Sequence, residues 1–294
     1  MGIVLNNNIV LAGKEDYSKI GNSRIGGKPD LPKQLNYPIF ENGFYEFILQ
    51  INLETDKIDN LPSKGLLSIF YGSLDKNEAI GYYFDTLENL EPKQIPISTQ
   101  FAGVTNFQEH ISHKFSIKRN EITPRIELPE YNDPQFTEEE NEMHWRIDYL
   151  RGNSYLMQNG FEDRNEIFFK SINLDLIPYG IRIQEDKTLL IQGQDGNKHY
   201  KTIKDLIECE KTTYYENRRF PQKSSRNEWI TQLKEFENNQ FKYIQKFNNY
   251  CCLLSLESLT ESRMTWGDLH KLEFWGFMED FKKGNFENIV STMP

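Results

Sequence analysis

The sequence Ser-Arg-Ile-Gly-Gly-Lys-Pro-Asp-Leu-Pro occupies positions Ser23–Pro32 and decides how the chain around it can fold. Gly26 and Gly27 permit positive φ angles that other residues resist. Pro29 and Pro32 fix φ and lack an N–H group, so neither can lie inside a helix or a central strand. The segment is therefore expected to be a stiff, irregular loop that leads into a strand.

Apolar and aromatic residues dominate the chain after this loop. Phe44–Leu53 is interrupted only by a few polar residues such as Glu46 and Gln50, which indicates a strand buried on most of both faces. Gly65–Tyr71 is expected to form the next strand, and Met1–Leu11 is either a short strand or an arm. Further strands are expected at Ile80–Phe84, Gln94–Ser98, Lys114–Lys118, Ile167–Ile177, Cys252–Glu257, Lys271–Phe277 and Ile289–Met293, with Leu87–Lys93 as a turn or loop.

Two helices are expected from their start signals. Thr137 begins a capping box, and the acidic residues after it suit the start of a helix. Ser225 begins a second capping box, ahead of the longest expected helix, Arg226–Phe247, whose apolar residues share one face. Lys201–Glu210 stays open between a short helix and the second arm of a hairpin whose turn is Gly193–Gly196.

The strand–loop–strand pattern recurs near the C-terminus. Gln50 and Gly65 are fifteen positions apart, and so are Ser255 and His270, in similar apolar surroundings. The repeat indicates a duplicated unit, with chance similarity between two apolar strands as the alternative. Two copies are too few for a solenoid.

The residues that resemble a known family lie at both ends of the chain. They are Arg24–Pro32, Tyr37, Pro38, Leu49–Leu53, Leu61, Pro62, Gly65–Phe70, Leu253–Ser258, Met264–Asp268 and Leu272–Trp275. In order and spacing they resemble the YwqG-like family, a bacterial group whose domain has no assigned function. Ser255, His270 and Tyr37 stand where that family usually has Gln, Gly and Trp. The resemblance implies an α+β fold and a soluble bacterial protein, with no catalytic residues to carry over.

The fold expected from these observations is α+β, a mostly antiparallel sheet with packed helices and pseudo-duplicated strand–loop–strand units. A single YwqG-like domain is expected to span residues 1–294, with halves of roughly 1–135 and 136–294. The middle of the chain, about residues 86–250, carries little that resembles the family, and its role stays open.

Composition excludes several classes of function. The formal charge of −10 argues against binding to nucleic acid, which requires neutralisation of phosphates, and it fits a basic protein partner. The cysteines Cys209, Cys251 and Cys252 are too few and too irregular for a disulfide framework, which suits a reducing, cytoplasmic location. No apolar run approaches the length of a membrane helix, so no membrane association is expected.

Two loops are candidates for one binding site. In a duplicated fold, the Arg24–Pro32 loop and the Trp266–Asp268 loop are expected to approach each other. The residues predicted to bind a ligand there are Arg24, Lys28, Gln50, Trp266 and Asp268. The alternative is that the glycines serve turns and that Trp266 fills the core.

Motifs for catalysis or metal binding are not found. The sequence has no Cys-x-x-Cys, no His-Glu-x-x-His and no Gly-x-Ser-x-Gly, and the neighbouring His110 and His113 are too few for a metal site. No catalytic residue, metal or cofactor is therefore predicted. If the chain is an enzyme after all, His110, His113 and Asp268 are the candidates.

Three functions remain open from the sequence. The first is a non-enzymatic cytosolic binding protein of immunity (antitoxin-like) type, which masks a basic, toxin-like partner by charge complementarity. The second is a small-ligand-binding module that uses the two-loop site. The third is an unrecognised enzyme.

Overall fold

The computed structural model describes most of the chain, which divides into two compact units. Unit 1 consists of Met1–Asn159 and Cys252–Pro294, and unit 2 consists of Gly160–Cys251. In the sequence, unit 2 is therefore inserted into unit 1. The described residues are 5–40, 43–73, 78–96, 111–121, 155–158, 164–177, 180–192, 198–213, 223–259, 262–264, 266 and 271–293.

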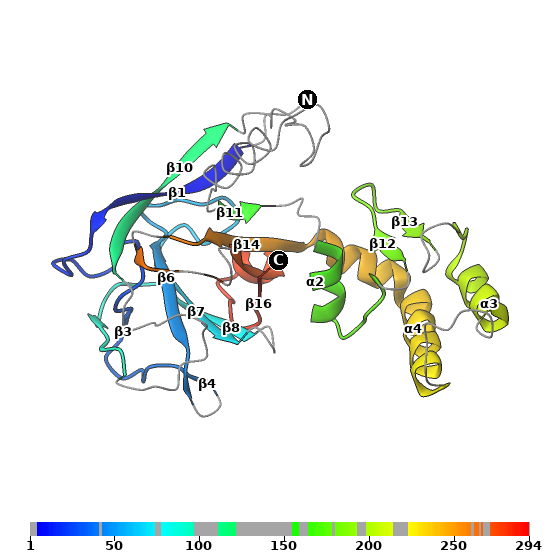
Figure 1. The fold of residues 1–294 in the computed structure, drawn as a ribbon. Coiled ribbons are helices and arrows are strands. Elements are labelled where there is room, and N and C mark those ends of the chain that lie inside the picture. Colours follow the sequence, from blue (N-terminus) through cyan, green and yellow to red (C-terminus); the bar gives the residue numbers. More distant parts are fainter. Residues whose placement is uncertain are drawn as a thin grey trace, which may run out of the picture. The chain divides into compact units, whose positions relative to one another are not determined.

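Unit 1 is built around a sheet of ten strands that closes on itself (Figure 1). The strands are β1 Leu5–Lys14, β2 Arg24–Ile25, β6 Glu46–Asn52, β7 Leu66–Ser73, β8 Glu78–Phe84, β10 His113–Glu121, β11 Tyr155–Gln158, β14 Tyr250–Glu257, β15 Lys271–Phe277 and β16 Val290–Thr292. Their order in the sheet is β1-β10-β2-β6-β7-β8-β16-β15-β14-β11. Each pairing whose register is described is antiparallel.

Short strands and one helix complete the described part of unit 1. The strand β3, Asp30–Pro32, pairs with β9, Leu90–Pro92. The strand β4, Ile39–Phe40, pairs with β5, Gly43–Phe44. The helix α5, Met278–Lys282, follows β15 directly.

A row of aromatic rings crosses the sheet from β6 to β8. The ring centroids of Phe47 and Phe70 are 5.4 Å apart, and those of Phe70 and Tyr82 are 5.7 Å apart. Tyr82 and Phe84 continue the row at 6.4 Å, with nearly parallel rings. Tyr37 packs edge-on against Phe70 from the chain before β6. The Gly- and Pro-rich segment therefore leads the chain over this face of the sheet and covers it with apolar side chains.

The described part of unit 2 combines three helices with one hairpin. The elements are α2 Arg164–Ser171, β12 Ile181–Ile183, β13 Leu189–Ile191, α3 Ile203–Thr213 and α4 Lys223–Asn248. Phe168 packs on Phe247 at 5.2 Å, and Phe169 packs on Phe236 at 5.6 Å, between ring centroids. These contacts join α2 to α4 and form the core of the unit.

Most strands predicted from the sequence are confirmed. Every residue of β6 is buried, as its continuous apolar pattern predicts. The predicted strands at Gly65–Tyr71, Lys114–Lys118 and Ile289–Met293 correspond to β7, β10 and β16. For Met1–Leu11 the sequence allows a strand or an arm, and β1 shows that its described part is a strand.

The prediction of an extended segment at Ile167–Ile177 is wrong. Arg164–Ser171 is the helix α2, and the residues after it form no strand. Ile167, Phe168 and Phe169 are all buried, so consecutive positions of this short helix face the core. A continuous apolar run of this length does not distinguish a buried strand from a buried helix.

The strand predicted at Gln94–Ser98 is also misplaced. Its described residues form no strand, and β9 lies earlier, within the predicted loop Leu87–Lys93. The position of β9 follows from its pairing with β3, in which Pro92 lies opposite Asp30 at the end of the pair. A proline tolerates that position because it ends the ladder.

The longest predicted helix is confirmed as α4, with one correction. Ser225 lies inside α4 and is not its N-cap, because the helix already begins at Lys223. The open segment Lys201–Glu210 is largely helical, as α3. Thr202 caps α3: its Oγ1 accepts from the Asp205 N–H and its N–H donates to Asp205 Oδ2, both at 3.1 Å. The helix predicted from Thr137 lies outside the described residues.

The α+β class is confirmed by the described residues, which combine one large antiparallel sheet with four helices. Among these residues, no helix has both the length and the apolar character that crossing a membrane requires.

Candidate functional site

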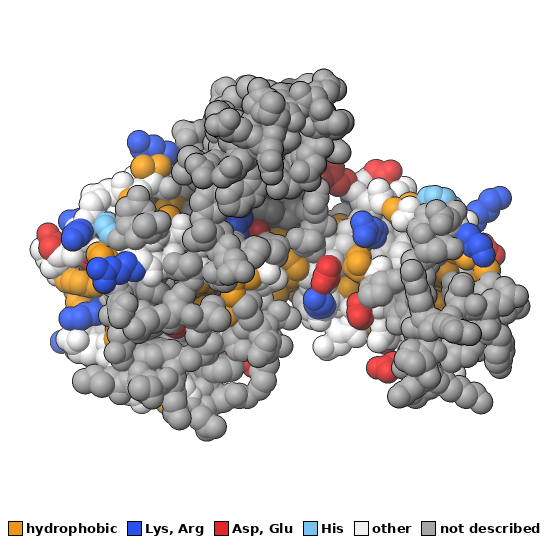
Figure 2. Space-filling view, in the orientation of Figure 1, with side chains coloured by type: hydrophobic (Ala, Val, Ile, Leu, Met, Phe, Trp, Pro, Cys, Tyr) orange, Lys and Arg blue, Asp and Glu red, His pale blue; other side chains and the backbone are white. Residues whose placement is uncertain are grey.

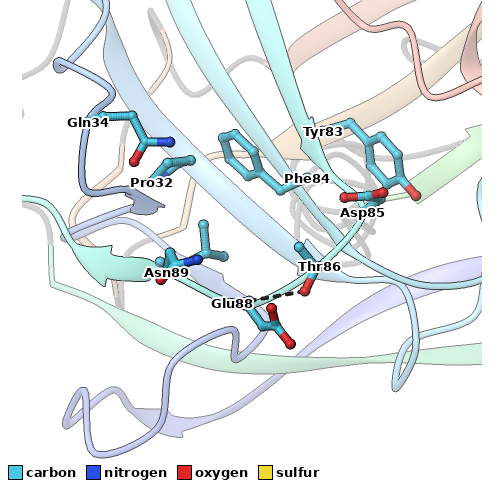
Figure 3. Close-up of a pocket in the computed structure, with 9 residues that line it drawn as sticks. Pro32, Gln34, Tyr83, Phe84, Asp85, Thr86, Glu88 and Asn89 are labelled. Atoms are coloured by element: carbon cyan, nitrogen blue, oxygen red, sulfur yellow. Dashed lines mark hydrogen bonds between the residues drawn. The ribbon is translucent and has the colours of Figure 1, made fainter.

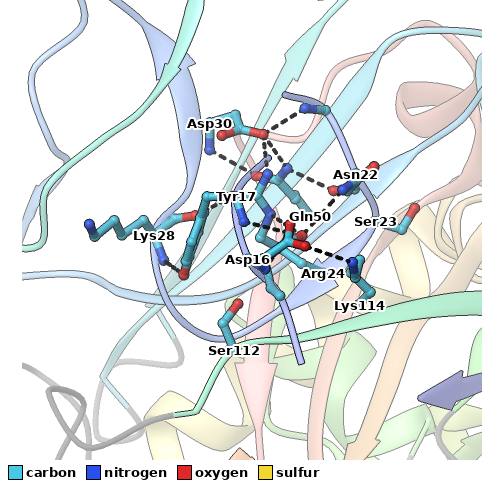
Figure 4. Close-up of polar contacts among 12 residues, drawn as sticks. Asp16, Tyr17, Asn22, Ser23, Arg24, Lys28, Asp30, Gln50, Ser112 and Lys114 are labelled. Carbon is cyan, nitrogen blue, oxygen red and sulfur yellow. Dashed lines mark hydrogen bonds and ion pairs between the residues drawn. The ribbon is translucent and has the colours of Figure 1, made fainter. Parts of the chain in front are cut away.

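Arg24 is fully buried at the start of β2, and carboxylates from two loops compensate its charge (Figure 4). Its Nη2 lies 2.5 Å from Asp30 Oδ2, and its Nε lies 3.4 Å from Glu15 Oε2. Its Nη1 donates to the carbonyl oxygen of Lys28 at 3.0 Å. A buried charge is costly unless it is paired and hydrogen-bonded, so these contacts fix the loop around Arg24.

Gln50 lies opposite Arg24 in the pairing of β2 with β6 and joins the same network. Its Oε1 accepts from the Asp30 N–H at 2.8 Å. Its Nε2 donates to Asp30 Oδ2 and to the carbonyl oxygen of Asn22, both at 2.8 Å. The side chain is fully buried, and its amide holds the glycine loop against the sheet.

Tyr17 covers the buried guanidinium group and fixes the next part of the loop. Its hydroxyl accepts from the Lys28 N–H at 2.9 Å, and its ring centroid lies 4.9 Å from Arg24 Cζ. Gly27 has a φ of +74°, and a Cβ there would lie 2.1 Å from the Tyr17 hydroxyl. Glycine is therefore required at this position, because the φ angle is positive and because there is no room for a Cβ atom. Lys28 is half-buried and has the most exposed side chain of Arg24, Lys28 and Gln50.

Residues 111–113 contact the Arg24–Pro32 loop and also Ser262, which precedes the Trp266–Asp268 loop of the predicted site. Ser112 Oγ donates to the carbonyl oxygen of Gly26 at 3.0 Å. The N–H of Ile111 donates to the carbonyl oxygen of Ser262 at 2.9 Å. The buried ring of His113 places Nδ1 3.0 Å from Ser262 Oγ. Residues 111–113 therefore link the glycine loop to Ser262, which is an indirect link between the two loops of the predicted site.

The C-terminal part of the predicted site is described only in part. Trp266 is fully buried, and its indole N–H donates to the carbonyl oxygen of Glu257 at 3.3 Å. Its backbone N–H donates to Ser258 Oγ at 2.9 Å. Trp266 therefore fills the core beside the end of β14. Asp268 and His110 lie outside the described residues.

A pocket of about 460 Å³ opens elsewhere in unit 1, beside the end of β8 (Figure 3). Its apolar walls are Tyr83, Phe84, Pro32 and Leu90, and its polar lining is Gln34, Asp85, Thr86, Glu88 and Asn89. None of these described lining residues is Lys, Arg or His. None of the residues predicted for the two-loop site belongs to the pocket.

Asp85 and Glu88 give this pocket its charge. Burial raises the pKa of Tyr83, and the neighbouring Asp85 carboxylate raises it further. The Tyr83 hydroxyl donates to the carbonyl oxygen of Lys64 at 3.1 Å, which fixes the position of this side chain. Neither Asp85 nor Glu88 forms an ion pair with any described residue.

The sequence prediction missed this pocket. The sequence does place two aromatic rings and two carboxylates around one turn, at Tyr83, Phe84, Asp85 and Glu88. The opposite wall comes from Gln34, about fifty positions earlier in the chain, and only the pairing of β3 with β9 brings it near. No group of three or more potential metal ligands occurs among the described residues.

A model of the family described as Domain of unknown function (DUF1963) matches residues 23–294. The chain belongs to this family. The DUF1963 match begins one residue before Arg24. It includes Arg24, Asp30 and Gln50 of the buried network, the pocket and all of unit 2. No curated protein matches the chain.

Proposed function

We propose that this DUF1963 chain is a YwqG-like bacterial protein of the cytoplasm. In this proposal it is a non-enzymatic binding protein of immunity (antitoxin-like) type that masks a basic partner protein. The observation that carries the proposal is the uneven distribution of charge between the two units.

The negative charge belongs to unit 1. Its sequence has 30 Asp and Glu against 19 Lys and Arg, whereas unit 2 has 14 against 15. Residues 122–154 alone have eight acidic and three basic residues. On the face shown in Figure 2, the described residues carry basic as well as acidic side chains and form no continuous acidic surface. The proposal therefore assigns partner binding to the acidic part of unit 1 around residues 122–154.

The buried network argues against direct contact of Arg24 and Gln50 with a substrate or a ligand. Arg24 and Gln50 are inaccessible, and their polar atoms bond to Asp30, Asn22 and the backbone of the loop itself. Groups that act on a substrate must reach it, at least through one water. These residues hold the glycine loop against the sheet.

Affinity capture from the source cells tests the proposal, with mass spectrometry of the retained proteins. The wild-type chain is expected to retain one basic protein near one-to-one at low salt. A variant with Glu138, Glu139, Glu140 and Glu142 changed to Gln is expected to retain much less of it, because four negative charges are lost.

The matched control removes the same charge from unit 2, by Asp175→Asn, Glu185→Gln, Glu228→Gln and Glu237→Gln, all at exposed positions. It is expected to retain the partner as the wild type does. An empty capture, or an equal loss in both variants, would contradict the proposal.

We also propose that the sheet of unit 1 is a pseudo-duplication. The series β1, β2, β6, β7, β8 corresponds to β10, β11, β14, β15, β16, because β2 pairs with β10 and β11 pairs with β1. The central pairs correspond as well: Gln50 lies opposite Ser68, and Ser255 Oγ donates to Glu273 Oε1 at 3.3 Å. The boundary between the repeats then lies between β8 and β10, earlier than the division at 135 and 136 expected from the sequence.

A further inference from the structure

We propose that the pocket beside the end of β8 binds a guanidinium group on an apolar stem. This inference is independent of the partner-masking proposal, because it rests on the pocket alone. The same chemistry is found in a free small molecule and in an arginine side chain of another protein, and the experiment below distinguishes these two sources.

The size and walls of the pocket fit such a ligand. Its volume of about 460 Å³ lies within the range of about 300–1,000 Å³ that small-molecule sites occupy. Figure 3 shows the Phe84 ring between the side of the pocket with Gln34 and Pro32 and the side with Tyr83 and Asp85. A planar guanidinium group stacks on aromatic rings, and its aliphatic stem packs on apolar walls.

The charges of the lining select a cation. Asp85 and Glu88 are the carboxylates of the pocket, and none of its described lining residues is basic. A carboxylate accepts two parallel N–H bonds from a guanidinium group, which an ammonium group cannot donate in that geometry. The side-chain amides of Gln34 and Asn89 supply further acceptors around the same opening.

The walls of the pocket are held in place by the fold. Phe84 ends the row of rings across the sheet and stacks on Tyr82. A Cβ at Gly284 would lie 2.6 Å from Tyr83 Cδ1, so the backbone there encloses the Tyr83 ring closely. The N–H of Lys33 donates to the carbonyl oxygen of Asn89 at 3.2 Å, which joins the two loops of the opposite wall. The apolar walls that a ligand meets are therefore preformed, which lowers the cost of binding.

Isothermal titration calorimetry tests the inference with two probes, agmatine and the blocked tripeptide acetyl-Gly-Arg-Gly-amide. The same tripeptide with citrulline in place of arginine is the neutral control ligand. The full chain is compared with its Asp85→Asn and Glu88→Gln variants and with Glu54→Gln, which removes an exposed carboxylate outside the pocket. Thermal melts verify that all variants are folded.

The expected result is binding of the arginine tripeptide that weakens about tenfold in Asp85→Asn and in Glu88→Gln, since each loses a charged hydrogen-bond acceptor. Glu54→Gln is expected to bind as the wild type does. Equal binding of agmatine assigns the site to free guanidinium compounds, and binding of the tripeptide alone assigns it to an arginine of a protein. The inference is overturned if neither probe binds at about 10 mM, if citrulline binds as well as arginine, or if Glu54→Gln weakens binding equally.

Discussion

Glu46 carries the most unusual carboxyl group in the described part of the chain. The side chain is fully buried in β6, and neither of its oxygens has a hydrogen-bond partner. Burial raises the pKa of Glu46 to about 8 from its ordinary value of 4.5. The group is therefore mostly protonated at neutral pH in the folded chain and ionised in the unfolded chain.

This difference predicts how stability depends on pH. Between about pH 4.5 and pH 8 the unfolded chain loses the Glu46 proton while the folded chain keeps it, so the free energy of unfolding falls as pH rises. The contribution of the protonated Glu46 carboxyl group to the free energy of unfolding is fully present below about pH 4.5 and is lost by about pH 8. This contribution is on the order of a few kcal/mol. Urea unfolding at several pH values measures it.

The Glu46→Gln variant has no carboxyl group to titrate, so its pH dependence over this range is expected to be flatter than that of the wild type. Glu54→Gln is the control, since Glu54 is exposed. Parallel pH profiles for the wild type and Glu46→Gln would contradict the buried, unpaired state of this carboxyl group.

The sequence predicted the members of the buried network better than their role. It selected Arg24, Lys28 and Gln50 because they are polar residues in or near a stiff loop, and the structure brings Arg24 and Gln50 together with Asp30. Residue type does not reveal whether a polar group faces a ligand or another part of the chain. That depends on the pairing of β2 with β6, which joins positions 26 residues apart.

At the scale of elements, one arginine stabilises the end of the longest helix. Arg164 of α2 donates to the carbonyl oxygens of Phe247 at 2.6 Å and Tyr250 at 3.0 Å. Burial lowers the pKa of Arg164, yet its charge complements the C-terminal end of the α4 dipole. Its Cζ also lies 4.2 Å from the centroid of the Phe247 ring.

Removing this arginine is expected to loosen the last turn of α4. Arg164→Met keeps much of the apolar stem and loses both hydrogen bonds, at a cost of about 2 kcal/mol in unfolding free energy. Hydrogen exchange at the C-terminal end of α4 is expected to be faster. The control, Arg182→Met, changes an exposed arginine of β12 and is expected to cost less than about 0.5 kcal/mol. Equal effects of the two changes would contradict the capping role.

Helices and strands with a distinctive pattern of apolar residues could be predicted from the sequence. Those that form only through contacts with residues distant in the sequence could not. The helix α4 is long enough to show its apolar face, and β6 is fully buried. The short helix α2 and the strand β9 instead depend on contacts with distant residues. The pocket shares this limitation, because its two walls come from separate stretches of chain.

At the scale of the whole molecule, the sheet predicts that unit 1 can fold without unit 2. Gln158 of β11 lies directly opposite Cys252 of β14, although unit 2 separates them in the sequence. A short turn can join antiparallel neighbours at this distance. Replacing Gly160–Cys251 with a turn such as Asn-Gly is expected to leave a folded, cooperatively unfolding unit 1.

Circular dichroism and thermal unfolding of this deletion variant check the prediction. A matched insertion of the same turn after Ile69, inside β7, is the control and is expected to prevent folding, because it shifts the register of a central strand. A deletion variant without a cooperative transition would show that unit 2 is required for the sheet.

The proposed binding of a basic partner by unit 1 through charge is tested by the association rate of the purified chain with the captured partner as ionic strength rises. The rate is expected to fall by about tenfold or more between about 20 and 200 mM salt. It is expected to fall by much less in the variant that lacks the four charges of Glu138, Glu139, Glu140 and Glu142. A rate that does not change with salt, or an identical salt dependence in that variant, would contradict this proposal.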